Sequence, residues 1–270
     1  MKNAPIFITI LTCFLFISFA AFGQELAGFL KWEQLPDMAG YDWSSENLVP
    51  SAVADDWICE NGMPINRIEW WGSYYFPSTF PYKNSDNFPD PTLTTGTPPG
   101  TVTGFYIGIF DNAEQGQCFP WPMPGELLYL TYVAIENANE TLYGVATKPG
   151  GQQENVWHYS VALDEFFYQE LGQKYWIAIM AVDGGSWEPN IDGATFTPMV
   201  QWGWHQTDKL LHGWGEDAVQ IWENLDSDCW DLLVDTEMAF RLYTIPEPST
   251  GMIILSSLGL LGVIVRKRVR

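Results

Sequence analysis

Carboxylic acids are the most numerous side chains in this sequence that could do chemistry. Its 270 residues include 33 Asp and Glu against 12 Lys and Arg. A glycoside hydrolase needs two carboxyl groups across a sugar cleft, one of them kept protonated by apolar surroundings. The acids that we consider first are Glu69, Glu188 and Glu223, each of which directly adjoins a tryptophan. The alternative is that each acid points to solvent from a strand whose neighbouring ring is buried.

Nucleophilic catalysis needs a serine or cysteine, a histidine base and an orienting acid. The chain has three histidines, His158, His205 and His212, and no Gly-x-Ser-x-Gly motif. His205 and His212 also lack the spacing of zinc peptidases. We therefore assign no catalytic residue, and the sequence favours a protein without enzymatic activity over a secreted carbohydrate-active hydrolase.

Aspartates supply the hard oxygen ligands that calcium takes. Asp55 and Asp56, which precede Trp57, and Asp217 form the set that we favour as calcium ligands. Calcium is the only cofactor that we expect, although no acid-rich turn matches the EF-hand loop. The Asp-Asp pair can equally be explained as a turn capped by its own side chains.

The 14 tryptophans indicate a binding surface or a large core. Trp70 and Trp71 point to opposite faces of their strand, whereas Trp202 and Trp204 share a face. Sugar rings stack on exposed indole planes. We predict a glycan-binding surface that includes Trp71, Trp202 and Trp204, with burial in the core as the alternative for each ring.

The formal net charge of −21 excludes nucleic acid as a partner, since phosphate binding needs a basic patch. Both ends of the chain have the features of targeting signals. Residues 1–23 read as a signal peptide, with Lys2, an apolar run to Phe22 and small residues before a cleavage site after Gly23. Export would place the body of the chain in a compartment that permits disulfides.

The C-terminal segment, residues 246–270, has three parts in order. Pro246, Glu247 and Pro248 come first, an uncharged run follows to Val265, and a basic tail ends the chain with Arg266, Lys267, Arg268 and Arg270. The run from 251 to 265 would make a helix of roughly 22 Å, which is a short membrane span with its basic end in the cytoplasm. An ordinary inner-membrane anchor is the simplest interpretation.

This arrangement resembles the sorting signal of PEP-CTERM proteins. The resemblance implies that an exosortase cuts near Pro-Glu-Pro and passes the protein to the envelope or extracellular matrix of a Gram-negative bacterium that makes extracellular polysaccharide. The resemblance implies where the protein is located, but it does not indicate what the body of the chain does.

The body, residues 24–245, is expected to be one all-β domain, a jelly-roll-like β-sandwich. Trimming both ends removes five of the 12 basic residues but only one of the 33 acidic ones, so the body is strongly acidic. A proline-rich stretch, 77–103, reads as a long loop, and helical periodicity occurs only at 163–171. Alternating or β-rich runs predict strands at 65–75, 104–110, 127–135, 141–146, 156–162, 174–182, 199–204, 218–222 and 238–244.

Three cysteines remain after removal of the leader: Cys59, Cys118 and Cys229. They allow three pairings and leave one thiol over. We favour Cys59 with Cys118, because both stand at the ends of strand-like runs.

The body also resembles an uncharacterised secreted β-domain of bacterial envelope proteins. The segments that carry this resemblance include 31–42, 54–59, 68–72, 104–111, 202–204, 216–219 and 238–240. That family has no assigned reaction. We therefore expect an envelope or biofilm-matrix protein that contacts extracellular polysaccharide or matrix partners, or a purely structural matrix component.

Overall fold

The structure is a computed structural model that describes residues 28–47, 50–75, 90–115, 118–183, 200–212, 215–222 and 229–245. Nearly all of these residues belong to one compact unit, Leu30–Thr244. The elements are β1 (Phe29–Gln34), β2 (Asp42–Ser44), β3 (Ser51–Ile58), β4 (Ile65–Tyr75), β5 (Val102–Ala113), β6 (Met123–Ala134), η2 (Ile135–Asn137), β7 (Thr141–Thr147), β8 (Gln153–Phe167), β9 (Lys174–Asp183), β10 (Gln201–His205), α2 (Lys209–His212), β11 (Val219–Trp222), β12 (Asp231–Leu232) and β13 (Phe240–Thr244).

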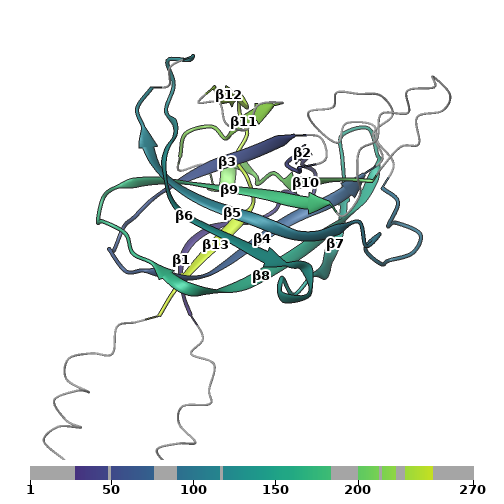
Figure 1. Cartoon of the computed structure of the whole chain (residues 1–270). Coiled ribbons are helices and arrows are strands. Elements are labelled where there is room, and N and C mark those ends of the chain that lie inside the picture. Colours follow the sequence, from purple (N-terminus) through teal and green to yellow (C-terminus); the bar gives the residue numbers. More distant parts are fainter. Residues whose placement is uncertain are drawn as a thin grey trace, which may run out of the picture. The chain divides into compact units, whose positions relative to one another are not determined.

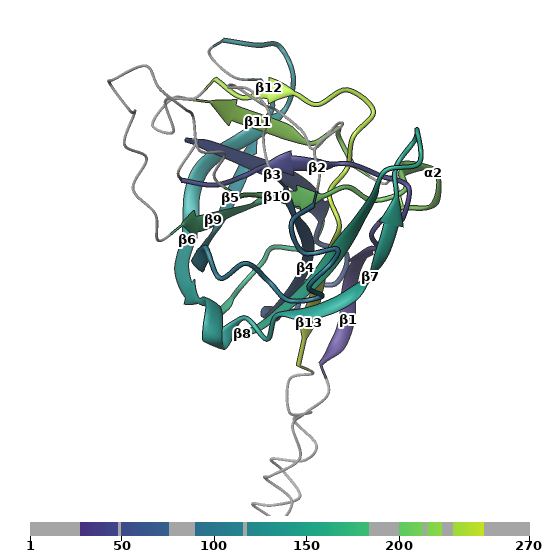
Figure 2. The same cartoon turned by 90° about the vertical axis from the view of Figure 1, so that its right-hand side faces the viewer.

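The strands form two antiparallel sheets, which lie face to face in Figures 1 and 2. Strand β4 is the centre of the seven-stranded sheet. Its residue Ile68 pairs with Val161 of β8 on one edge and with Leu242 of β13 on the other. Farther along, β10 replaces β13 on that second edge. Strands β7, β1 and β2 flank β8, β13 and β10, and the six-stranded sheet runs β12-β11-β3-β9-β5-β6.

Alternation along each strand sends one set of side chains into the space between the sheets. On β4, Ile68 and Trp70 enter the main core, whereas Arg67 and Glu69 face away from it. Strands β8, β10 and β13 add to the core from the same sheet, and β3, β5 and β9 add to it from the other. The predicted all-β sandwich is confirmed.

Two details of the sequence prediction change. The helical periodicity at 163–171 does not give a helix, because residues up to Phe167 continue β8 and pair with β4. The predicted loop, 77–103, is described from residue 90 on: residues 90–101 lack strands, but 102 and 103 already belong to β5, which begins at Val102. No helix within the described residues is long and apolar enough to cross a membrane. The signal peptide and the sorting segment 246–270 lie outside the described residues.

The disulfide also differs from the prediction. Cys118 pairs with Cys229, whereas Cys59 is a free, buried thiol. Cys59 follows β3 and packs in the main core, whereas the sulfur of Cys118, in the β5–β6 connection, is already bonded to Cys229. The predicted Cys59–Cys118 bridge is therefore wrong.

Removing this bridge should destabilise the fold, because it closes a long loop: its two cysteines are 111 residues apart in the sequence. We expect Cys118→Ser with Cys229→Ser to lower the free energy of unfolding by about 2–4 kcal/mol. Urea denaturation of the oxidised wild type and the double variant measures this. Equal midpoints would show that the bridge does not constrain the unfolded chain.

Candidate functional site

The three tryptophans predicted to bind glycan are fully buried. Trp202 and Trp204 share a face, as expected, but that face lies against the main core. The Trp202 ring fills the space that Gly72 leaves open on β4, and the Trp204 indole N–H donates to the Ala239 carbonyl oxygen (2.9 Å). Neither ring can stack on a sugar.

Trp71 does point away from the main core, as its strand position predicts, but it is not exposed either. It belongs to a second, smaller cluster against which Leu35 and Met38 pack from the segment that follows β1. The prediction of an exposed platform at Trp71, Trp202 and Trp204 is therefore wrong. The exposed ring in this region is Tyr143 of β7, which meets the Trp71 ring edge-on at 5.7 Å and is 48% exposed.

A strip of polar side chains lies beside Trp71 on the outer face of the seven-stranded sheet. Strand register places them together: Arg241 pairs with Glu69, and Tyr243 pairs with Arg67. The Arg67 guanidinium covers the Tyr243 ring at 3.8 Å. We call this group the outer strip; it consists of Glu33, Arg67, Glu69, His158, Arg241 and Tyr243.

Glu69 is the centre of the outer strip. Its carboxylate accepts a hydrogen bond from the Tyr243 hydroxyl (3.0 Å) and lies 3.4 Å from His158 Nε2, 3.5 Å from Arg67 Nη2 and 3.6 Å from Arg241 Nη1. Burial opposes ionisation, but hydrogen bonds from His158 and Tyr243 and the charges of His158 and Arg67 outweigh it, so the pKa of Glu69 is lowered. A carboxyl group so surrounded is ionised at neutral pH and is a poor proton donor.

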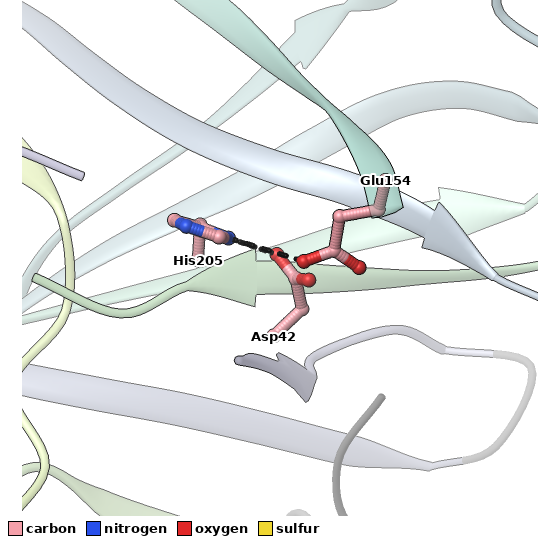
Figure 3. A group of neighbouring side chains, drawn as sticks. All are labelled: Asp42, Glu154 and His205. Carbon is pink, nitrogen blue, oxygen red and sulfur yellow. Dashed lines mark hydrogen bonds and ion pairs between the residues drawn. The ribbon is translucent and has the colours of Figure 1, made fainter. Parts of the chain in front are cut away.

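A second group of charges is enclosed within the fold where β2, β8 and β10 approach one another (Figure 3). His205 Nδ1 lies 2.7 Å from Asp42 Oδ1 and 3.9 Å from Glu154 Oε1. Lys148 forms an ion pair with Glu154, and its Nζ lies 3.8 Å from Asp42 Oδ2. Asp42, Glu154 and His205 are completely buried, as is nearly all of Lys148. We call these four residues the buried charge cluster.

This arrangement resembles part of a catalytic triad but cannot act as one. His205 Nε2 lies 2.8 Å from the Asp37 carbonyl oxygen, which only accepts hydrogen bonds, so Nε2 carries a proton. Both ring nitrogens are therefore occupied by the protein itself. Burial raises the pKa of Asp42, but His205 and Lys148 outweigh it and hold that pKa well below its usual range. Burial and the adjacent Asp42 raise the pKa of Glu154 well above its usual range.

Three further carboxyl groups lie close together, two of them on β3 and one in the segment before β13. Asp55, Asp56 and Glu237 can each place one oxygen within 4.8 Å of the others, and all three are completely buried. We call them the acidic triplet. Two of its members were predicted as calcium ligands, but the structure supplies Glu237 as the third acid, because the predicted Asp217 forms an ion pair with Lys209.

The acidic triplet is electrostatically unfavourable when fully ionised. Burial, opposed in part by Lys174, raises the pKa of Asp56 to about 6. Burial and neighbouring charges raise the pKa of Glu237 to about 7. Burial, then Glu237 and Asp56, raise the pKa of Asp55 well above its usual range. These side chains need either protons or a cation to offset their mutual repulsion.

Glu46 is a separate buried acid beside Trp202. Its Oε2 accepts a hydrogen bond from the Trp202 backbone N–H (3.0 Å), and no donor among the described residues reaches Oε1. Burial, with a smaller contribution from the Asp183 charge, raises the pKa of Glu46 to about 8. The folded protein therefore holds a proton there that the unfolded chain releases above its ordinary pKa of 4.5.

Because the folded state binds the extra proton, this group should reduce stability as pH rises from about 4.5 to about 8. We expect Glu46→Gln to be more stable than wild type at pH 8.5 by roughly 2 kcal/mol. Between pH 6 and 8.5 its free energy of unfolding should fall less than that of the wild type. Thermal and urea denaturation at both pH values measure this. If the stability of the variant depends on pH as strongly as that of the wild type, Glu46 does not contribute to the pH dependence of stability.

Other candidates from the sequence are only partly described. Glu188, Glu223 and the sorting residues 246–248 and 266–268 lie outside the described residues. Sequence reasoning missed Glu237, Glu154 and Lys148, because no local motif signals them. They reach their partners only through strand pairing between distant segments.

Comparison with known families gives two matches, which overlap at residues 244–249, where the compact unit ends. A family model described as a domain of unknown function (DUF7901) matches residues 30–249, which contain the compact unit. A second one, the PEP-CTERM protein-sorting motif, matches residues 244–268. No curated protein and no solved structure matches the chain. The expected sorting signal and uncharacterised domain are both confirmed.

Proposed function

We propose that this chain, which belongs to the DUF7901 family and carries a C-terminal PEP-CTERM sorting motif, binds extracellular polysaccharide through its β-sandwich without catalysing a reaction. The sorting motif implies export, a membrane-anchored precursor and recognition by an exosortase. The Gram-negative envelope or biofilm matrix is the destination that we propose for the processed protein.

The observation that carries the proposal is the outer strip together with Tyr143. Polysaccharides present hydroxyl groups that both donate and accept hydrogen bonds, and ring faces that stack on aromatic planes. The strip offers a carboxylate acceptor at the partly exposed Glu33 and guanidinium donors at the partly exposed Arg67 and Arg241, while the buried Glu69 lies against both guanidinium groups. Tyr143 adds a half-exposed ring at the side of the strip. This surface replaces the tryptophan platform expected from the sequence.

The chemistry of the described acids supports binding over hydrolysis. Of Glu69, Glu188 and Glu223, the three acids considered first as proton donors, Glu69 alone lies within the described residues, and its lowered pKa is unsuited to a general acid. The acidic triplet and the carboxyl groups of the buried charge cluster are completely buried, so no sugar can reach them without opening the fold. A secreted hydrolase remains the competing hypothesis.

A polysaccharide pull-down of residues 24–245 tests the proposal. We expect the wild type to be retained by an acid-free bacterial or plant glucan or galactan, since its own charge repels acidic polymers. Arg67→Ala with Tyr143→Ala should weaken retention about tenfold, which corresponds to about 1.4 kcal/mol. Tyr106→Ala is the matched control, because that ring is 41% exposed but belongs to the other sheet.

The same samples distinguish the two hypotheses. New reducing ends during incubation would establish hydrolysis and contradict a purely binding role. Failure to retain any neutral polysaccharide, or equal loss in the Tyr106→Ala control, would contradict binding at the outer strip.

A further inference from the structure

We propose that Asp55, Asp56 and Glu237, the acidic triplet, hold one calcium ion inside the sandwich. This site is independent of the polysaccharide surface, because it lies at β3 and at the segment before β13, and its residues are not part of the outer strip. Burial of three carboxyl groups alone would not identify a metal site. The evidence for one is which of their oxygen atoms accept hydrogen bonds and which do not.

Each carboxyl group has at least one oxygen fixed by a neutral donor. The Met238 and Asp56 backbone N–H groups donate to the two oxygens of Asp55 (2.6 and 2.8 Å). The Glu216 backbone N–H donates to Asp56 Oδ1 (2.9 Å), and the Gln34 amide donates to Glu237 Oε2 (3.3 Å). These bonds hold the side chains in place without neutralising them, as supporting hydrogen bonds do for metal ligands.

Two oxygens of the triplet are left without a hydrogen bond. Among the described residues, neither Asp56 Oδ2 nor Glu237 Oε1 accepts a hydrogen bond, although both residues are completely buried, and Asp56 Oδ2 has only a longer ion pair with Lys174 (3.6 Å). Glu237 lies within hydrogen-bonding reach of the Asp55 carboxyl group, which donates only when it is protonated. A cation placed among the three groups would satisfy both free oxygens and convert repulsion into attraction.

The nearby lysines do not fill this role. Lys174 Nζ is 3.6 Å from Asp56 Oδ2 but closer, at 3.0 Å, to the exposed Glu216 carboxylate, and its side chain is partly exposed. Lys209 forms its ion pair with Asp217. Lys174 is thus shared between Asp56 and Glu216, and Lys209 pairs with Asp217, so one shared ammonium group cannot balance the three central carboxyl groups.

The chemistry of the donors indicates which ion fits. All three ligands are carboxylate oxygens, with no nitrogen or sulfur, and such ligands favour calcium or magnesium over zinc. Ligand oxygens within 4.8 Å of one another can all reach one ion at the oxygen distances of about 2.3–2.6 Å that calcium takes, and calcium accepts irregular geometry more readily than the magnesium octahedron does. Because the site is closed to solvent, the ion would enter as the exported chain folds.

The test uses residues 24–245, which contain the whole compact unit, refolded with 1 mM calcium, with 1 mM magnesium or with chelator. We expect one calcium ion per chain by native mass spectrometry. We expect the melting temperature to rise by about 5 °C or more over the chelator sample, with a smaller rise in magnesium. Wild-type protein that binds no calcium, or melts equally in all three samples, would overturn the proposal.

Two variants locate the ion. Asp56→Asn and Glu237→Gln should each lose at least half of the calcium-dependent rise, whereas Asp164→Asn, at an exposed position on β8, should keep all of it. In chelator, the two amide variants should melt no lower than wild type, because the amide removes a repulsive buried charge. A full calcium response in both variants would place the ion elsewhere. If neither variant folds, the native mass of the wild type still decides whether the ion is present.

Discussion

Replacing Phe105 by alanine should lower the free energy of unfolding by about 3–5 kcal/mol. The ring is completely buried at the point where the two sheets meet. It makes edge-on contacts with Trp70, Tyr159 and Trp202 at centroid distances of 5.1, 4.9 and 5.1 Å. These large rings are fixed by one another and by the strands, so they cannot collapse into the space that the substitution leaves.

The adjacent residue provides the control. Tyr106 follows Phe105 on β5 but points to the opposite face, where it is 41% exposed and contacts Tyr132. We expect Tyr106→Ala to change stability by less than about 1 kcal/mol. Urea denaturation followed by tryptophan fluorescence measures both variants. Similar midpoints for the two would mean that the aromatic core is not the main source of stability.

Replacing Lys148 by methionine should destabilise the protein by a similar amount, about 3–5 kcal/mol, for an electrostatic reason. Lys148 faces both acids of the buried charge cluster, Asp42 and Glu154. Without its ammonium group, only His205 would remain to offset two carboxyl groups that water cannot reach. The cost is that of leaving charge buried and unpaired, and the loss of packing is small.

A double variant separates these two contributions. Lys148→Met combined with Glu154→Met removes the ammonium group together with the carboxyl group that pairs with it, and should recover at least half of the lost stability, since apolar pairs often replace buried ion pairs at little cost. Denaturation midpoints at pH 7 compare the single and double variants. If the double variant is less stable than Lys148→Met alone, the cluster does not depend on charge balance.

Much of the sandwich could be predicted because most of its strands show a local pattern of alternating or β-rich residues in the sequence. Strands β4 and β9 follow closely the runs expected at 65–75 and 174–182, since apolar side chains recur there at strand spacing. Strand β3 was missed because Asp55 and Asp56 interrupt its apolar pattern. That strand forms because its backbone pairs with β9 and β11, while Asp55 and Asp56 accept hydrogen bonds from Met238 and Glu216, which are 183 and 160 residues away.

Contacts between segments that are distant in the sequence also explain the errors in the predicted site. The orientation of Trp71 followed from alternation, but its burial depends on Leu35 and Met38, which no local rule brings to it. The partner of Cys118 is 111 residues away and could not be chosen from strand ends. The calcium hypothesis found Asp55 and Asp56 because they are adjacent in the sequence, and it missed Glu237 because only the fold brings it there.

The intact mass of the chain recovered from the producing cell shows whether the protein is exported and trimmed at both ends. We expect the mature protein in the envelope or matrix fraction, beginning at Gln24 and lacking the basic tail at 266–270. Recovery of the untrimmed chain of 30.6 kDa from the cytosol, with both ends intact, would contradict this expectation.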